Sequence, residues 1–138
     1  MLNHVTIMGR LTKDPELRRT GSGIAVTSFT VAVARDILPK DGGERETDFI
    51  ECVAWRGAGE FVARNFHKGK MIVVSGRIQQ RNWTDKDGNK RRTTEIVAEN
   101  VYFAGDKKES SGGDTPGYVG SNEQEYEKLE DEDVQLPF

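Results

Sequence analysis

The sequence has little of what several classes of protein require. Its 138 residues contain one cysteine, Cys52, which excludes an internal disulfide bond, and two well-separated histidines, His4 and His67. These three residues match no recognised spacing of zinc ligands, so we expect neither a metal nor another cofactor. No apolar run approaches the roughly 18 residues of a membrane span, and the N-terminus lacks the basic and apolar segments of a signal peptide. We therefore expect a cytosolic protein.

Charge is distributed unevenly along the chain. Residues 1–105 contain 17 lysines and arginines against 13 acidic residues, whereas residues 106–138 contain 3 against 10. The net charge of -3 therefore hides a basic body and an acidic tail. A basic body is typical of a protein that binds a polyanion, and the acidic tail indicates a separate role.

Alternating apolar and polar residues predict an all-β domain with one short helix in residues 1–105. A single apolar stripe predicts that helix over residues 57–67, and turn-forming residues predict a loop over residues 12–23. This order, with the helix between the third and fourth strands, is that of an OB-fold, a five-stranded barrel that binds oligonucleotides or oligosaccharides. The strands are expected over residues 3–11, 24–35, 49–55, 70–83 and 91–103.

The last two predicted strands are joined by a turn over residues 85–90, which contains the Asp-Gly pair typical of a hairpin. If about eight residues in each arm pair at about 3.3 Å per residue, the hairpin extends about 26 Å. The sequence therefore predicts an arm that projects beyond a small barrel.

Beyond residue 105 the chain is too poor in apolar residues to form a core. Residues 106–122 predict a flexible linker, and residues 123–138 predict a disordered acidic tail. A mobile acidic segment that ends in an aromatic ring and a free carboxylate suits a basic, apolar pocket on a partner protein. A solubilising tail is the alternative, although a terminal Leu-Pro-Phe serves solubility poorly. The expected partner-binding residues are Asp131, Glu132, Asp133, Leu136, Pro137 and Phe138.

The strand over residues 49–55 is apolar on both faces. Phe49 and Trp55 share one face with Glu51, because side chains alternate along a strand, while Cys52 lies on the other. Such a strand is either buried on both sides or offers flat rings to a flat ligand. Phe49 fits both interpretations, whereas Trp55 favours stacking. Trp83 lies in a polar stretch that has little core to enter, which favours an exposed role at a ligand.

Aromatic rings and arginines occur together in the predicted sheet. Stacked bases and neutralised phosphates are the two contributions that bind a single strand without reading its sequence. Glu51 lies on the same face and should repel phosphate unless a cation such as Arg35 or Arg77 pairs with it. The candidate nucleic-acid-binding residues are Phe49, Trp55, Trp83, Arg10, Arg18, Arg35, Arg56, Arg77, Arg81, Arg91 and Arg92.

Other functions of an OB-fold fit the residues less well. A nuclease needs clustered carboxylates for a metal and a general base, but Glu51 is isolated on its strand. A sugar-binding module does not require so many arginines. We therefore expect a binding protein and not an enzyme, with single-stranded RNA binding as the alternative, since no residue is identified that reads a 2′-hydroxyl.

The chain resembles the bacterial single-stranded DNA-binding protein family, which has phage-borne and plasmid-borne members. The resemblance covers residues 2–104 and the extreme C-terminus. It is carried by residues 3–11, 14–16, 48–55, 76–84 and 94–98, and by the terminal acids followed by Leu136-Pro137-Phe138.

This resemblance implies a homotetramer of OB-folds with DNA wrapped over Phe49, Trp55 and Trp83. It also implies a role in DNA replication, recombination and repair at the nucleoid, with partner proteins recruited by the tail. Two departures stand out. Val134-Gln135 separates the acids from Leu136, and the end of the second strand has Arg35 and Ile37 where some members have another tryptophan.

Overall fold

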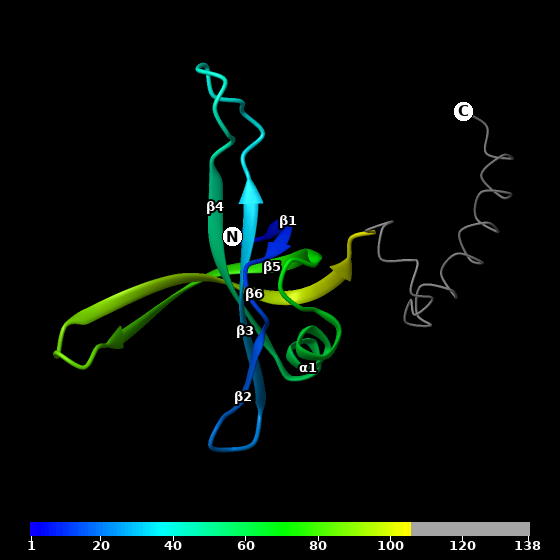
Figure 1. Ribbon diagram of the computed structural model, residues 1–138. Coiled ribbons are helices and arrows are strands. Elements are labelled where there is room, and N and C mark those ends of the chain that lie inside the picture. Colours follow the sequence, from blue (N-terminus) through cyan, green and yellow to red (C-terminus); the bar gives the residue numbers. More distant parts are fainter. Residues whose placement is uncertain (106–138) are drawn as a thin grey trace, which may run out of the picture. The chain divides into compact units, whose positions relative to one another are not determined.

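The computed structural model describes residues 1–105, and the predicted linker and tail, residues 106–138, lie outside the described residues (Figure 1). Within residues 1–105, no helix is long and apolar enough to cross a membrane. The elements in chain order are β1 (Val5–Leu11), β2 (Glu16–Arg19), β3 (Ala25–Ala34), β4 (Thr47–Trp55), α1 (Arg56–Asn65), β5 (Met71–Thr84) and β6 (Lys90–Phe103).

Five of the strands close into a ring. The sheet runs in the order β1-β5-β6-β4-β3, and a further pairing of β1 with β3, at Arg10↔Ala32 and Leu11↔Val31, joins its two ends. The β4–β6 contact is parallel, and the other pairings are antiparallel. A closed ring of five strands with one helix between the third and fourth of them confirms the predicted OB-fold.

The prediction of a loop over residues 12–23 is wrong at Glu16–Arg19, which forms the short strand β2. It pairs antiparallel with the edge of β3, from Glu16↔Ser28 to Arg19↔Ala25. All four residues of β2 are exposed, so no alternation of buried and exposed side chains marks this strand in the sequence. Backbone hydrogen bonds to β3 hold it instead.

The core fills the ring and extends under α1. Ile72, Val31 and Val74 are fully buried inside the barrel, and Val62 of α1 is fully buried against them. Ring closure also requires a residue without a side chain on β1. A Cβ at Gly9 would collide with the carbonyl oxygen of the facing strand β3, so the two strands can approach only at a glycine.

β5 and β6 continue far beyond the barrel, as predicted. A bulge lies between Ser75 and Gly76, and the ladder then runs without interruption from Arg77↔Val97 to Thr84↔Lys90, a stretch of eight residue pairs. Figure 1 shows this hairpin extending away from the other strands. We call residues 77–97 the projecting hairpin.

Asp85 organises the turn at the tip of the projecting hairpin. Its carboxylate accepts hydrogen bonds from the backbone N–H groups of Asn89 and Asp87 and from the side chain of Arg91. These bonds, that of Asn89 above all, hold the pKa of Asp85 below its ordinary value. Gly88 supplies the positive φ of 81° that the turn requires.

A buried hydroxyl fastens α1 to the sheet. Thr27 on β3 is completely buried, and its Oγ1 donates a hydrogen bond to the carbonyl oxygen of Gly59 in α1 at 2.7 Å. A Cβ at Gly59 would contact the carbonyl carbon of Ala54 at 3.2 Å, so the helix backbone lies directly on the end of β4. Because α1 follows Trp55 without a loop, this contact also fixes the end of β4.

We expect Thr27→Val to lower the free energy of unfolding by about 1 kcal/mol, because it replaces a buried hydrogen-bond donor by a methyl group of similar size. Denaturant unfolding monitored by circular dichroism measures the change. Thr30→Val is the matched control, since Thr30 lies on the outer face of the same strand and should change stability by less than about 0.5 kcal/mol. Equal losses in the two variants would contradict the assigned role of the Thr27 hydroxyl.

Candidate nucleic-acid interface

The outer surface of β3 and β4 carries the first two candidate aromatic residues. Directly paired residues of adjacent strands share a face, and Phe49 pairs with Ala32, which in turn pairs with Arg10. Phe49 is 67 % exposed, so it belongs to the surface and not to the core. Its ring is therefore available for stacking, with a cation two strands away.

Trp55 lies at the other end of the same face. It pairs with Val26, which pairs with Arg18 of β2, so the short strand missed by the sequence analysis brings Arg18 beside the row that ends in Trp55. The indole is 43 % exposed. Phe49, Trp55 and the cations beside them thus lie on one side of the sheet.

This face continues onto the projecting hairpin. Val53 pairs with Val97, and Val97 pairs with Arg77, so the outer surface of β4 passes across β6 to β5. Side chains alternate along β5, which puts Arg81 and Trp83 on the same side as Arg77. We call this continuous surface, from Arg10 and Arg18 across β4 to Trp83, the outer face.

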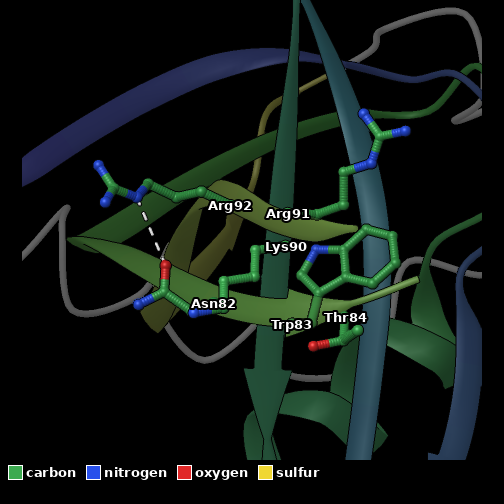
Figure 2. A pocket seen from close by; sticks show the side chains of 6 residues that line it. All are labelled: Asn82, Trp83, Thr84, Lys90, Arg91 and Arg92. Carbon is green, nitrogen blue, oxygen red and sulfur yellow. Dashed lines mark hydrogen bonds between the residues drawn. The ribbon is translucent and has the colours of Figure 1, made fainter. Parts of the chain in front are cut away.

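Trp83 is held at a fixed angle on the projecting hairpin. Its Nε1 donates a hydrogen bond to Oγ1 of Thr93 at 2.8 Å, and the indole remains 42 % exposed. Its cross-strand partner is Arg91, and Figure 2 shows both side chains at the same end of the hairpin. A depression of about 680 Å³ at this site is lined by Asn82, Trp83, Thr84, Lys90, Arg91 and Arg92.

The two arginines of this depression have different surroundings. Arg91 donates from Nε to the carboxylate of Asp85 at 3.0 Å, while Arg92 donates to the side-chain oxygen of Asn82 at 3.4 Å (Figure 2). Arg92 pairs with Asn82 and so lies on the opposite face of the projecting hairpin from Trp83. One ring and several cations nevertheless meet at the hairpin end, an arrangement suited to one base and its phosphates.

Arg35 is placed differently from the other candidate arginines. Its guanidinium binds both carboxylate oxygens of Asp48 at 3.0 Å and also pairs with Glu46. These contacts raise the pKa of Arg35 and lower that of Asp48, chiefly through their shared hydrogen bond. Strand alternation puts Arg35 on the side of β3 that carries Val33, away from Phe49. Arg35 thus braces the base of the β3–β4 loop.

Glu51 has no ion-pair partner among the described residues. Neither Arg35 nor Arg77 pairs with it, since Arg77 donates to the side chain of Gln79 at 3.2 Å, and among the described residues Glu51 has no hydrogen bond or ion pair. It lies in a depression of about 210 Å³ in the middle of the outer face. Three cations and three acids line this depression, and neutral residues complete it. The charged residues are Lys13, Arg18, Arg81, Glu16, Glu51 and Glu95.

Arg56 has an unusual backbone. It follows Trp55 directly, opens α1, and is the one non-glycine residue with a positive φ, 56°, in the described part of the chain. Sequence reasoning named its charge but missed its conformation, which no residue pattern marks. The same reasoning missed Thr93, whose hydroxyl orients Trp83, and Lys90, which lines the depression at the hairpin end.

The described residues offer little to other chemistry. Within residues 1–105, no group of three or more histidine, cysteine or acidic side chains is placed to hold a metal ion. Cys52 is 2 % exposed, and burial is the main cause that raises its pKa to about 12. The predicted partner-binding residues, from Asp131 to Phe138, lie outside the described residues.

Comparisons with known proteins identify the family of this chain. A family model described as the single-strand binding protein family matches residues 2–104. Single-stranded DNA-binding protein 3 of Listeria innocua is 51 % identical over 116 residues, 83 % of this chain and 71 % of the relative. Single-stranded DNA-binding protein A of Bacillus subtilis is 47 % identical over 122 residues, 88 % of this chain and 70 % of the relative.

A third relative extends further along the chain. The single-stranded DNA-binding protein of Caldanaerobacter subterraneus subsp. tengcongensis is 43 % identical over 129 residues, 94 % of this chain and 85 % of the relative. All three names are those of binding proteins, in agreement with the prediction that the protein is not an enzyme. The chain belongs to the single-strand binding protein family.

Proposed function

We propose that this protein binds single-stranded DNA without strong sequence preference and protects it during replication, recombination and repair, in the cytoplasm at the nucleoid. The observation that carries the proposal is the exposure of Phe49, Trp55 and Trp83 on one continuous outer face. The names of the relatives support DNA as the ligand.

The chemistry of the outer face accounts for weak sequence preference. Every base has an aromatic face, so a ring that stacks on one base stacks on all of them. Arg77 and Arg81 lie beside the row of rings and attract phosphates, which are the same at every nucleotide. Glu51, which has no ion pair among the described residues, repels phosphates from its own position on β4. Bases then lie over the rings while the backbone follows the cations.

We expect Trp83→Ala to weaken binding of a deoxythymidine oligomer by about 1 to 3 kcal/mol, the contribution of one stacked base. Anisotropy of a labelled oligomer measures the affinity. Trp83→Phe keeps a flat ring and should retain most of it. In the unmodified protein, titration with the oligomer should quench tryptophan fluorescence, and affinity should fall steeply with added salt. An unquenched signal would refute stacking.

Single-stranded RNA is tested in the same assay. Poly(dT) and poly(U) compete for the labelled protein, and we expect poly(dT) to compete better. Equal competition would favour the RNA alternative, whereas the loss in Trp83→Ala would remain, because stacking does not depend on the sugar. The two outcomes therefore separate the nature of the ligand from the mode of binding.

A second surface supports self-association into the homotetramer implied by the family. On the outer side of β1, β5 and β6, Met8 pairs with Val73, which pairs with Tyr102. Met8 is 57 % and Tyr102 54 % exposed, so one apolar row crosses three strands. A second copy that presents the same row would bury it in a two-fold contact, and a tetramer needs one further interface.

We expect Tyr102→Asp to reduce the oligomeric state, because two carboxylates would face each other across a two-fold contact. Native mass spectrometry measures the mass of the assembly. Ile37→Asp is the matched control: Ile37 is 82 % exposed in the β3–β4 loop, away from the apolar row, and its replacement should leave the mass unchanged. An unchanged mass in Tyr102→Asp would reject this surface as the interface.

The tail is proposed to recruit partner proteins through its acids and its terminal Leu136-Pro137-Phe138. A linker of 17 residues, 106–122, spans about 21 to 25 Å as a flexible chain, so partners would dock close to the bound DNA. The acids are also expected to compete weakly with DNA for the basic outer face.

Deletion of residues 123–138 should leave DNA affinity unchanged or increase it at low salt, because it removes seven acidic side chains and one lysine. Oligomer titrations at low and high salt measure this effect. Phe138→Ala is the control, since it keeps every acid and should bind DNA like the unmodified chain. A large loss of DNA affinity on deletion would show that the tail belongs to the DNA site.

A further inference from the structure

Asn3 joins the N-terminal segment to the middle of β5 through two hydrogen bonds. Its Nδ2 donates to the carbonyl oxygen of Ile78 at 2.8 Å, and its Oδ1 accepts from the backbone N–H of Ile78 at 3.0 Å. Because the backbone offers one donor and one acceptor, only one orientation of the amide satisfies both. The side chain of Asn3 thus satisfies the backbone donor and acceptor of Ile78, as the backbone of a neighbouring strand would.

Ile78 lies where the projecting hairpin leaves the barrel. The outer edge of β5 pairs with β1 only as far as Gly76. On the other arm, β6 pairs with β4 only as far as Ile96, whose partner in β4 is Cys52. Ile96 is also the cross-strand partner of Ile78. Within the described residues, the root of the hairpin is therefore held by β4 on one side and by Asn3 on the other.

Side-chain burial does not replace this anchor. Ile78 is 47 % exposed, and of residues 77–84 only Gln79 is partly buried. Trp83 lies five residues beyond Ile78, or about 17 Å at about 3.3 Å per residue. A rotation of about 10° at the root would therefore move the indole by about 3 Å, close to the separation of about 3.5 Å between carbon atoms in contact. Small changes at the root decide whether Trp83 meets a base.

We propose that Asn3 is a positioning residue for DNA binding: its two hydrogen bonds to Ile78 fix the projecting hairpin so that Trp83 continues the row of Phe49 and Trp55. This inference rests on the proposed function, since it assigns Trp83 to a base. Asn3 itself touches the backbone of β5 and contributes no ring or positive charge to the outer face.

The first test measures hairpin motion without DNA. The chain has two tryptophans, so Trp55→Phe leaves Trp83 as the single indole. In this background we expect Asn3→Ala to add a nanosecond component to the decay of tryptophan anisotropy, because the root of the hairpin loses one of its two anchors. Asn3→Asp should behave alike, since one carboxylate oxygen would face the carbonyl oxygen of Ile78. An unchanged decay in both variants would overturn the proposal.

The second test measures affinity for a deoxythymidine oligomer in a double-mutant cycle. Asn3→Ala should weaken binding about threefold to tenfold when Trp83 is present, a part of the contribution of one stacked base. In the Trp83→Ala background the same change should have an effect of less than about twofold, because no ring remains to be positioned. Equal losses in both backgrounds would show that Asn3 acts only on general stability, and would reject the positioning role.

His4→Ala is the matched control for both tests. His4 is the exposed neighbour of Asn3, and among the described residues its side chain forms a hydrogen bond with Thr6 and none with Ile78, so its replacement leaves the contact of Asn3 with Ile78 intact. Anisotropy decay and affinity should both match those of the unmodified protein. Failure of the proposed function gives a different result. If Trp83 does not bind a base, Trp83→Ala alone binds the oligomer as tightly as the unmodified chain. The anisotropy decay without DNA still reports whether Asn3 holds the hairpin.

Discussion

The hydrogen-bonded ladder between β5 and β6 is the constraint on which the rest of the structure depends. Its inner part closes the barrel and buries Ile72 and Val74, and its outer part carries Trp83 into solvent. The pairing register shifts once, at the bulge between Ser75 and Gly76, but the side chains of β5 alternate through it, with Ile72, Val74 and Gly76 buried and Arg77, Arg81 and Trp83 on the opposite side. A slip of one residue would turn Trp83 to the opposite face and expose core residues at the same time. Core packing therefore determines the side on which the stacking residue appears.

Ion pairs also fix the positions of several arginine side chains on the outer face. Arg18 pairs with Glu16 at 3.4 Å, Arg81 with Glu95 at 3.4 Å, and Arg91 with Asp85 at 3.0 Å. Fully exposed pairs contribute about 0 to 1 kcal/mol each, but only the Arg18–Glu16 pair is of this kind, since the side chains of Glu95 and Asp85 are 11 % and 17 % exposed. The acids thus orient these arginines in the free protein, and under the proposed function this would reduce the ordering that DNA binding requires. Glu51 has no such pair among the described residues.

Local patterns in the sequence predict the fold well, because apolar and polar side chains alternate along the barrel strands and the helix has one apolar stripe. The long hairpin follows from the lengths of its two arms. The patterns fail where side chains carry no burial signal, as in β2, and where contacts join distant parts of the chain. Glu46 and Asp48 form ion pairs with Arg35 across a loop, and Asn3 forms hydrogen bonds with Ile78, which lies 75 residues away in the sequence. Such pairings follow from the barrel topology, which must be known before they can be identified.

Arg56 shows where stability and the site have different requirements. Its φ of 56° costs a residue with a Cβ about 1 to 2 kcal/mol, a cost that glycine does not have. This conformation turns the chain from β4 directly into α1 and leaves Trp55 at the exposed end of its strand. The adjacent Gly57, by contrast, has no positive φ, so the flexible residue and the strained position do not coincide. A glycine at position 56 would remove this cost together with the positive charge that follows Trp55 in the sequence. The barrel thus carries a strained residue at the junction of β4 and α1, where glycine would be the more stable choice.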